Sequence, residues 1–488
     1  MRLTNTLTGC KDEFVPSDPQ YIKMYACGVT VYDKCHLGHA MQAILYDIFA
    51  RYLRFKGYKV TYVRNFTDVD DKIIARASQL GVSPLELSDQ MIEISRRDML
   101  SLKVKPADFE PRVSEYIPQI IAYIQDLMTK GFAYVGQDGS VYFRVRLKED
   151  YGKLSRQNIS ELRCGVRKDV ETGKEDPVDF ALWKVEETPG ATWDSPWGRG
   201  RPGWHIECSV MASEILGDSF DIHGGGRDLV FPHHENEIAQ SEAKSGGTYA
   251  RYWVHNGLLT VNRQKMSKSL NNFISIEDAV RDYGYELIRF NIYQYHYQSN
   301  IDFSAQGFFL GLSRLYSMYR TRQRVIDYMA RHDLTPQSAN SHPGFHQAFC
   351  EAMDDDFNLP RVMVVIQSVL QSQNEIMDKK FSAQNAMELL SLESLLHNIL
   401  PILEIGLREP QEFFHEIHSR YLALKSLTFA WVTEKIELRM KHRTDKNFAM
   451  ADQIRDELLA LGVSLLDSRD KTSWELSEKA LEELILLK

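Results

Sequence analysis

The sequence predicts an α/β fold: a Rossmann-like parallel-sheet domain with an inserted module, followed by an α-helical bundle and a small C-terminal mixed α/β module. Three observations support this prediction. A strand–helix–strand pattern begins near residue 21, sheet-forming segments return after a Pro- and Gly-containing stretch, and residues 305–425 are almost wholly helical in pattern. The 488 residues suffice for about three domains of ordinary size.

The first strand–helix–strand unit spans residues 21–66. Residues 21–27 are rich in strand formers, residues 40–55 carry apolar side chains at helical spacing before Gly57, and residues 59–66 resemble a second strand. This length suits a right-handed crossover between parallel strands. We therefore expect ligands at the carboxyl ends of these strands.

The remainder of the first domain is interrupted. Residues 85–130 have a helical pattern, residues 136–147 indicate a hairpin, and sheet-forming segments return at residues 219–226 and 253–261. We expect residues 1–124 and 204–305 to form the two halves of the first domain, 125–203 the inserted module, 306–424 the helical bundle and 425–488 the C-terminal module.

Composition excludes several classes of protein. Apolar residues make up 43% and charged residues 26%, which argues against disorder. The net charge of −9 disfavours a nonspecific nucleic-acid coat, although a local basic strip can still meet phosphates. Six cysteines are too few for a disulfide framework, and the N-terminus lacks the apolar core of a signal peptide. We expect a soluble, cytoplasmic protein whose thiols are free or bind metal.

Two motifs suit phosphate binding. His36-Leu37-Gly38-His39 opens the predicted helix, where free backbone N–H groups, two imidazoles and the small Gly38 favour a phosphate. Lys265-Met266-Ser267-Lys268-Ser269 follows a predicted strand and offers two ammonium groups to a triphosphate. Alone, the first motif is more typical of a helix cap and the second of a solvated turn. Together, in this order, they resemble the HIGH and KMSKS signatures of class I aminoacyl-tRNA synthetases.

A helix expected to begin at Pro232 offers metal ligands. His233 and Glu237 share one face at i and i+4, and these two side chains would make half of a zinc site. Thiolates are the natural complement, and Cys27 and Cys208 are candidates, although a lone cysteine is often a core residue. His234 and Glu237 stand at i and i+3, so periodicity leaves open which imidazole binds.

Five blocks of sequence, in order, resemble the cysteinyl-tRNA synthetase family. The blocks are YACGVTVYDKCHLGHA, YVRNFTDVDDKI, RPGWHIECS, DIHGGGRDLVFPHHENEIAQSE and KMSKS, and the resemblance covers about residues 21–305 densely and the remainder thinly. It implies that Cys27, Cys208, His233 and Glu237 bind one zinc ion per chain. Arg227 and Asn271 depart from the family pattern without affecting these ligands.

The resemblance also implies the reaction. ATP with Mg²⁺ would activate L-cysteine to cysteinyl-adenylate, and the cysteinyl group would pass to the 3′-terminal ribose of tRNA(Cys). Zinc prefers a soft thiolate to an alcohol, so we expect discrimination against serine on the order of 10⁴ or more without an editing site. His36, His39, Lys265 and Lys268 are the expected catalytic residues, and Lys268 is the expected main contact of the transition state. We expect a monomer.

Further residues have two interpretations each. Trp204 either forms a wall of the substrate pocket or packs in the core. The glycine-rich turn either contacts ATP or only turns the chain; the expected nucleotide contacts are Gly38, His223, Gly224, Gly225, Gly226 and Lys268. Asp68, Asp70 and Asp71 stay unassigned beyond capping a helix. Residues 354–360 resemble the entry to a DALR bundle, or their acids only complement a helix N-terminus.

The C-terminal module carries a basic strip. The strip is an excess of basic over acidic residues between positions 435 and 447, and it would either meet phosphates or only solvate the surface. Its basic residues are Lys435, Arg439, Lys441, Arg443 and Lys446. The residues that follow, together with Trp474, resemble the anticodon-binding module of the family.

Three other functions compete with this interpretation. A ligase that passes activated cysteine to an amino sugar, as in mycothiol synthesis, would resemble the first domain but lack residues 425–488. A noncatalytic RNA-binding paralogue would have lost phosphate or metal residues, which are intact here. A simple nucleotidylyltransferase would not explain KMSKS or the helical C-terminal third.

Overall fold

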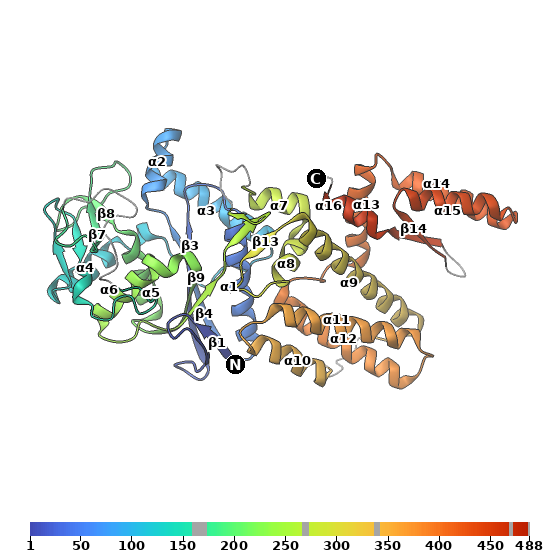
Figure 1. The fold of residues 1–488 in the computed structure, drawn as a ribbon, viewed down its shortest axis with the longest axis horizontal. Coiled ribbons are helices and arrows are strands. Elements are labelled where there is room, and N and C mark those ends of the chain that lie inside the picture. The colour runs from blue at the N-terminus through green and yellow to red at the C-terminus, as the bar shows by residue number, and fades with distance from the viewer. Residues whose placement is uncertain (159–172, 266–272, 336–341, 468–471, 487–488) are drawn as a thin grey trace.

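The computed structural model describes residues 1–158, 173–265, 273–335, 342–467 and 472–486. The α/β part occupies the left and centre of Figure 1, the helices α9 to α12 the lower right, and the C-terminal module the upper right. The predicted fold class is therefore confirmed. The expected boundary at residue 125 falls inside α4 (Ile117–Thr129), and the other boundaries stay predictions.

A four-stranded parallel sheet forms the centre of the α/β part. Its order is β10 (Ala250–Asn256), β9 (Phe220–Gly226), β3 (Tyr21–Thr30) and β4 (Lys59–Thr67). α1 (Leu37–Phe55) connects β3 to β4, as the apolar spacing predicted. Because all four strands run in one direction, the residues at their carboxyl ends, including Cys27, His223 and His255, come together at one edge.

α1 also joins the sheet to the helical bundle. Its apolar face is buried, and it packs against α7 (Ile276–Tyr283), α8 (Tyr285–Tyr293) and α12 (Ala383–Leu403). Near its C-terminus, the Tyr52 hydroxyl donates to Asp354 Oδ1 at 2.7 Å, and Arg51 Nη1 lies 2.6 Å from Glu404 Oε1. The helix therefore spans from the carboxyl edge of the sheet to the bundle.

Helices cover the sheet and lead to the inserted module. They are α2 (Asp71–Leu80), α3 (Pro84–Ser101), α4, α5 (Trp204–Leu216) and α6 (Glu235–Ser245). The helical pattern expected over residues 85–130 holds for α3 and α4, but residues 102–112 between them are not helical, and a 3₁₀ turn, Val113–Glu115, precedes α4.

The inserted module is an antiparallel sheet in the order β5 (Ala133–Val135), β6 (Val141–Phe143), β7 (Phe180–Val185) and β8 (Gly200–Pro202). A 3₁₀ turn, Val145–Leu147, follows β6. The pairing of β5 with β6 confirms the expected hairpin.

Two expected elements begin or end elsewhere. The helix expected from Pro232 starts at Glu235, because residues Val230–His234 form a π-helical turn in which Phe231 is non-helical; a 3₁₀ turn, Arg227–Leu229, precedes it. The segment expected at 253–261 is divided between two sheets. β10 belongs to the main sheet, and β11 (Leu259–Val261) pairs with β12 (Gln264–Lys265) and β13 (Ile301–Phe303).

An N-terminal hairpin of β1 (Arg2–Asn5) and β2 (Cys10–Glu13) lies beside β10. The Thr6 backbone N–H donates to the Trp253 carbonyl at 2.9 Å, and the Trp253 N–H donates to Asn5 Oδ1 at 3.0 Å. The turn after β1 is thereby fixed against the main sheet.

The helical region contains α9 (Ala305–Arg331), α10 (Pro343–Asp354), α11 (Leu359–Asp378), α12 and α13 (Pro410–Leu424), as expected for residues 305–425. Among the described helices, α12 alone is long and apolar enough to cross a membrane. It packs between α1 and α11, and half of its apolar window is buried, as in the core helix of a globular domain.

Three consecutive aspartates attach the bundle to the α/β part. Asp354 accepts from Tyr52 on α1, and Asp355 pairs with Lys11 on β2 at 2.8 Å. Asp356 is buried and accepts from Thr4 on β1 and from the Tyr297 hydroxyl. The expectation that these acids complement a helix N-terminus is therefore wrong; Asn358 caps α11 instead.

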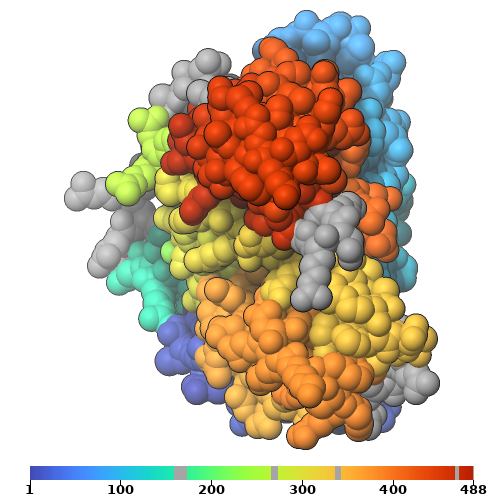
Figure 2. All heavy atoms as spheres, turned by 90° about the vertical axis from the view of Figure 1, so that its right-hand side faces the viewer, coloured from blue at the N-terminus to red at the C-terminus, as the bar shows by residue number. Residues whose placement is uncertain are grey.

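The C-terminal module consists of α14 (Phe429–Thr444), α15 (Phe448–Ala460), β14 (Val463–Asp467), β15 (Thr472–Leu476) and α16 (Glu478–Leu486). In Figure 2 it lies above the bundle helices. The Trp474 ring stacks on His418 of α13 at 4.3 Å, and the Tyr316 hydroxyl of α9 bonds His418 Nε2 at 2.8 Å. Trp474 therefore anchors the module to the bundle.

Candidate active site and metal centre

Four buried side chains from distant parts of the chain converge at the carboxyl edge of the sheet. Cys27 lies on β3, Cys208 on α5, His233 in the turn before α6 and Glu237 on α6, and one ligand atom of each lies within 4.8 Å of all the others. The two Sγ atoms are 3.7 Å apart, Cys27 Sγ is 3.5 Å from Glu237 Oε1, and His233 Nε2 is 3.0 Å from the same oxygen. We call this set the metal group.

A second set shares Cys27 and Glu237 and adds His223 and His234, again within 4.8 Å. The His223 and His234 rings contact the metal group through hydrogen bonds. His223 Nε2 lies 2.9 Å from Glu237 Oε2, and His234 Nε2 lies 3.3 Å from Cys27 Sγ. Both His233 and His234, the two candidates that periodicity left open, therefore lie close to Glu237.

Electrostatics distinguish the members of the metal group. Burial raises the pKa of the Cys27 thiol, whereas a hydrogen bond from Cys27 lowers the pKa of Cys208 to about 6. Burial disfavours a charge on His233, but Glu237 and Cys208 outweigh it and raise its pKa to about 10. A thiolate, an imidazolium and a carboxylate thus meet in one buried site, and their charges sum to −1. Such donors also suit a divalent ion.

Trp204 begins α5 beside the metal group. Its ring stacks on His233 at 4.3 Å, and 38% of the residue is exposed. The residue is therefore not the core residue of the alternative interpretation, and it closes one side of the metal group toward solvent.

The expected phosphate motif occupies the N-terminus of α1. His36 is the N-cap: its Nδ1 accepts from Gly38 N–H at 3.0 Å, and His39 Nδ1 accepts from the His36 N–H at 3.3 Å. Burial, with a smaller effect of His36, lowers the pKa of His39 to about 3. Because both Nδ1 atoms accept, each neutral ring carries its proton on Nε2 and can donate from there.

The second phosphate motif begins in β12 with Lys265; Met266, Ser267, Lys268 and Ser269 lie outside the described residues. The chain that follows contacts the first motif. The Leu37 N–H donates to the Ile274 carbonyl at 3.2 Å, and the Phe273 ring meets His36 edge-on at 5.5 Å. The chain that resumes at Phe273 therefore meets the first motif at one end of α1.

The glycine-rich end of β9 packs against Tyr46 of α1 and against His234 beside the metal group. A Cβ at Gly224 would overlap the Tyr46 ring, and one at Gly225 would lie 2.8 Å from His234 Cε1. His223 is fully buried against Trp253, with ring centroids 4.4 Å apart. This placement at the metal group differs from the nucleotide contact expected for His223.

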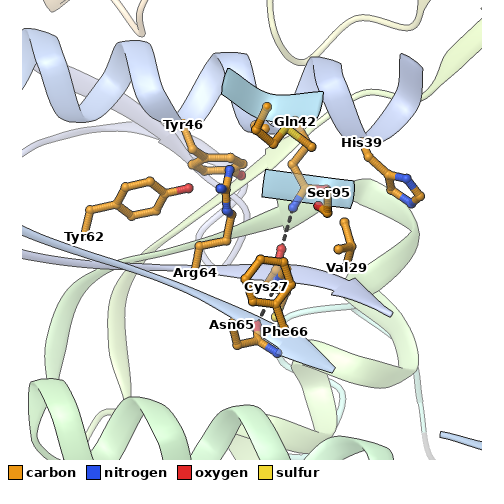
Figure 3. Close-up of a pocket in the computed structure, with 13 residues that line it drawn as sticks. Cys27, Val29, His39, Gln42, Tyr46, Tyr62, Arg64, Asn65, Phe66 and Ser95 are labelled. Atoms are coloured by element: carbon orange, nitrogen blue, oxygen red, sulfur yellow. Dashed lines mark hydrogen bonds between the residues drawn. The ribbon is translucent and has the colours of Figure 1, made fainter. Parts of the chain in front are cut away.

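Sequence patterns missed the polar residues that hold the Cys27 backbone. Gln42 of α1 donates to the Cys27 carbonyl at 2.6 Å, and the Gly28 N–H donates to Asn65 Oδ1 of β4 at 2.8 Å (Figure 3). The buried Arg64 reaches Glu110 at 3.1 Å and lines a small cavity beside Cys27. Their positions in the sequence could have indicated them. Asn65 lies near the end of a predicted strand, and Gln42 lies one helical turn beyond the phosphate motif.

The unassigned aspartates serve the fold. Asp70 caps α2, as expected, by accepting from the Lys72 N–H. Asp68 is buried and accepts from the backbone and hydroxyl of Ser114 at 3.0 and 2.5 Å. Asp71 pairs with Arg201 of β8 and thereby ties α2 to the inserted module.

Three of the five side chains of the basic strip are paired with acids of their own module. Arg439 and Arg443 both pair with Asp467 of β14, and Lys435 pairs with Glu457 of α15 at 2.7 Å. Within the described part of the chain, only Lys441 and Lys446 of the five are outside an ion pair. The strip therefore offers phosphates fewer charges than its composition indicates.

Comparisons with known proteins agree with this geometry. The family described as tRNA synthetases class I (C) catalytic domain matches residues 13–309. A cysteine–tRNA ligase of Geobacter sulfurreducens is 43% identical over 480 residues, covering 97% of this chain and 99% of that protein. One from Thermococcus onnurineus is 42% identical, with the same coverage.

Solved structures share the fold at low identity. The methionyl-tRNA synthetase of Mycobacterium tuberculosis in complex with methionyl-adenylate matches with a TM-score of 0.60 and 14% identity, covering 79% of this chain and 92% of that one. A leucyl-tRNA synthetase in a ternary complex from Agrobacterium radiobacter matches with a TM-score of 0.58 and 12% identity, covering 80% and 85%. From the family match and the two relatives, the chain belongs to the cysteine–tRNA ligase family of class I tRNA synthetases.

Proposed function

We propose that the chain activates L-cysteine to cysteinyl-adenylate and transfers the cysteinyl group to the 3′-terminal ribose of tRNA(Cys), with one zinc ion held by the metal group. As a member of its family, the chain is a ligase that activates cysteine and charges tRNA. The observation that carries the zinc assignment is the convergence of two sulfurs, one nitrogen and one oxygen within 4.8 Å in a buried site.

The donors fit zinc, which takes four ligands of these types. We assign Cys27, Cys208, His233 and Glu237 as ligands because His223 and His234 have another role. Their Nε2 atoms already face Glu237 and Cys27, as outer hydrogen-bond donors face the ligands of a metal. When bound, zinc supplies a soft Lewis acid that prefers the thiolate of cysteine to the alcohol of serine.

The chain's own side chains bind and orient the substrates. Trp204 forms a wall of the cysteine pocket beside His233. His36 and His39 donate from Nε2 to the phosphates of ATP at the N-terminus of α1, where the helix dipole also favours negative charge. Gly38 allows ATP to approach the backbone. These contacts position the α-phosphate for in-line attack by the cysteine carboxylate.

Charge stabilisation supplies the remaining catalysis. We assign Lys265 and Lys268 to the negative charge that develops on the phosphates, and Gly224 to Gly226 to the nucleotide. Mg²⁺ accompanies ATP. The tRNA ribose hydroxyl then accepts the acyl group, and no covalent enzyme nucleophile is needed.

We assign α14 to α16 to the tRNA anticodon, a monomeric enzyme to the functional state and the cytoplasm to its location. The curated relatives support the first assignment, because their alignments cover 97% of the chain and thus extend into this module.

The test is ATP–pyrophosphate exchange across a panel of amino acids, with and without a zinc chelator. We expect exchange with cysteine only, lost with the chelator and restored by zinc, followed by charging of a tRNA with the GCA anticodon. Equal exchange with serine and cysteine would contradict the zinc assignment. Undiminished charging after removal of residues 425–488 would contradict the anticodon assignment.

A further inference from the structure

A chain of hydrogen bonds runs from the N-terminal hairpin to the metal group. Thr6 Oγ1 lies 2.7 Å from His255 Nδ1, His255 Nε2 lies 2.7 Å from His234 Nδ1, and His234 Nε2 lies 3.3 Å from Cys27 Sγ. His255, His234 and Cys27 are all buried. Each ring nitrogen of His255 and His234 therefore has one hydrogen-bond partner in this series, which begins at Thr6 and ends at Cys27.

The groups at the two ends of this series of hydrogen bonds determine which atom donates in each bond. A neutral imidazole has one N–H donor and one acceptor nitrogen, so the tautomer of His255 determines that of His234. A thiolate only accepts, so a Cys27 thiolate requires the proton of His234 on Nε2. His234 Nδ1 then accepts from His255 Nε2–H, and His255 Nδ1 must accept in turn.

Thr6 is the residue that can complete this arrangement. Its hydroxyl can donate to His255 Nδ1, which would otherwise be a buried acceptor without a partner, at a cost of about 1–3 kcal/mol. Two contacts fix its position: the Thr6 N–H bonds the Trp253 carbonyl, and Asn5 bonds the Trp253 N–H. Both rings are buried, and burial lowers the pKa of His255 to about 3, so that this ring stays neutral.

We propose that Thr6 is a positioning residue of the metal centre: its hydroxyl fixes His255 and His234 in the tautomers whose last N–H group points at Cys27 Sγ. The inference rests on the proposed function, because it takes Cys27 as an anionic zinc ligand. It involves no change in the number of protons, only their placement. Thr6 thereby acts on the zinc ligand Cys27 only indirectly, through His255 and His234.

The matched test compares Thr6→Val, which keeps the shape and removes the hydroxyl, with Thr6→Ser, which keeps the hydroxyl. Thr8→Val is the control, because the Thr8 hydroxyl in the same hairpin bonds Asn5, Cys10 and Asp12 and neither of the two histidines. The first readout is zinc affinity of the full chain by competition with a chelator. We expect Thr6→Val to weaken binding about 10-fold, as outer contacts of metal ligands do, while Thr6→Ser and Thr8→Val bind as the unchanged chain does.

The second readout is nitrogen NMR of histidine-labelled, zinc-loaded protein, which reports the protonated nitrogen of each ring. We expect Nε2–H for His255 and His234, and a mixture of tautomers in Thr6→Val. A proton on His255 Nδ1 in the unchanged chain, or equal zinc affinity of the Val and Ser variants, would overturn the inference. If Thr6→Val does not fold, Thr6→Ala serves in both readouts.

Failure of the proposed function looks different. If the unchanged chain binds no zinc, the metal assignment falls before any variant is compared. If it binds zinc and Thr6→Val binds it equally well with unchanged tautomers, only the role of Thr6 falls.

Discussion

Nε2 of His223 lies 2.9 Å from Oε2 of Glu237, on the carboxylate oxygen that points away from the thiols. The Tyr249 hydroxyl donates to the same oxygen at 3.2 Å. Oε1 instead faces Cys27 Sγ at 3.5 Å and His233 Nε2 at 3.0 Å. Two donors therefore fix the carboxylate so that one oxygen only is presented to the metal group.

Replacing His223 should loosen Glu237. We expect His223→Ala to weaken zinc binding about 10- to 100-fold, because the ligand loses its shorter outer hydrogen bond. Tyr249→Phe, which removes the longer of the two bonds, should have a smaller effect. Chelator competition on both variants measures the difference, and a larger loss for Tyr249→Phe would reverse the assignment.

Removing one thiol should abolish metal binding and discrimination together. We expect Cys208→Ser to lose zinc and to activate cysteine poorly, because an alcohol is a weak ligand for zinc. Cys35→Ser is the control, since Cys35 is buried near the same strand but bonds Ser95 outside the metal group. Metal content and exchange with cysteine and serine are measured on each. Full zinc occupancy with unchanged preference in Cys208→Ser would refute the ligand set.

Lys268 should act on the transition state more than on binding. We expect Lys268→Ala to slow adenylate formation about 10²- to 10³-fold, the usual cost of losing one charge-stabilising donor. Cysteine binding should change little, because cysteine reaches the metal group independently. Single-turnover rates and binding titrations separate the two, with the exposed Lys379→Ala as the control. Equal losses in the rate of adenylate formation and in cysteine affinity would indicate that Lys268 stabilises the bound substrate and the transition state equally.

The docking of the C-terminal module should weaken in acid. Burial lowers the pKa of His418 to about 4, whereas the unfolded residue titrates near 6.5. Between these values only the unfolded state binds the proton, so stability falls as pH drops through this window, by about 2 kcal/mol at pH 5. Hydrogen exchange of the α14–α16 amides at pH 7 and 5 measures it.

The His418 variant isolates this effect. His418→Phe keeps the stack on Trp474 but has no titrating group, so it should show less loss between pH 7 and 5 than the unchanged chain. His397→Gln, at an exposed position on α12, is the control and should behave as the unchanged chain does. An equal pH dependence in His418→Phe would assign the effect to other groups.

The buried Asp356, where the bundle meets the α/β part, should contribute more to the free energy of unfolding than the neighbouring Asp355. We expect Asp356→Ala to destabilise the fold by about 2–4 kcal/mol, because Thr4 and Tyr297 lose their buried acceptor. Asp355→Ala removes only the partly exposed pair with Lys11 and should cost less than about 1 kcal/mol. Urea unfolding compares the two variants, and equal midpoints would contradict the assignment.

Local patterns were sufficient for the elements but not for their partners. The spacing of apolar residues predicted α1 and its flanking strands, since a buried helix face depends on period alone. The resemblance supplied Cys27 and Cys208, whose convergence no spacing could show. Periodicity could not separate His233 from His234, because both lie within reach of Glu237 and their hydrogen-bond partners come from other strands.

Long-range partners also explain the differences. Asp356 bonds a threonine 352 positions away, so its neighbours in sequence gave no sign of its role. The charges of Arg439 and Arg443 were counted as available for phosphates, but both side chains pair with Asp467 of a later strand. Trp474 was grouped with the anticodon-binding module by resemblance alone, and its stack on His418 of α13 could not be read from its neighbours in sequence.

The 19-residue α1 joins chemistry at one end to architecture at the other. At about 1.5 Å per residue, it is a rod of roughly 28 Å with the two histidines at its tip and Tyr52 at its base. Asp354 and Glu404 hold that base from the bundle, while β4 and β9 of the sheet also contact the helix. The two histidines of the first motif and the contacts that join sheet to bundle therefore stand on a single continuous helix.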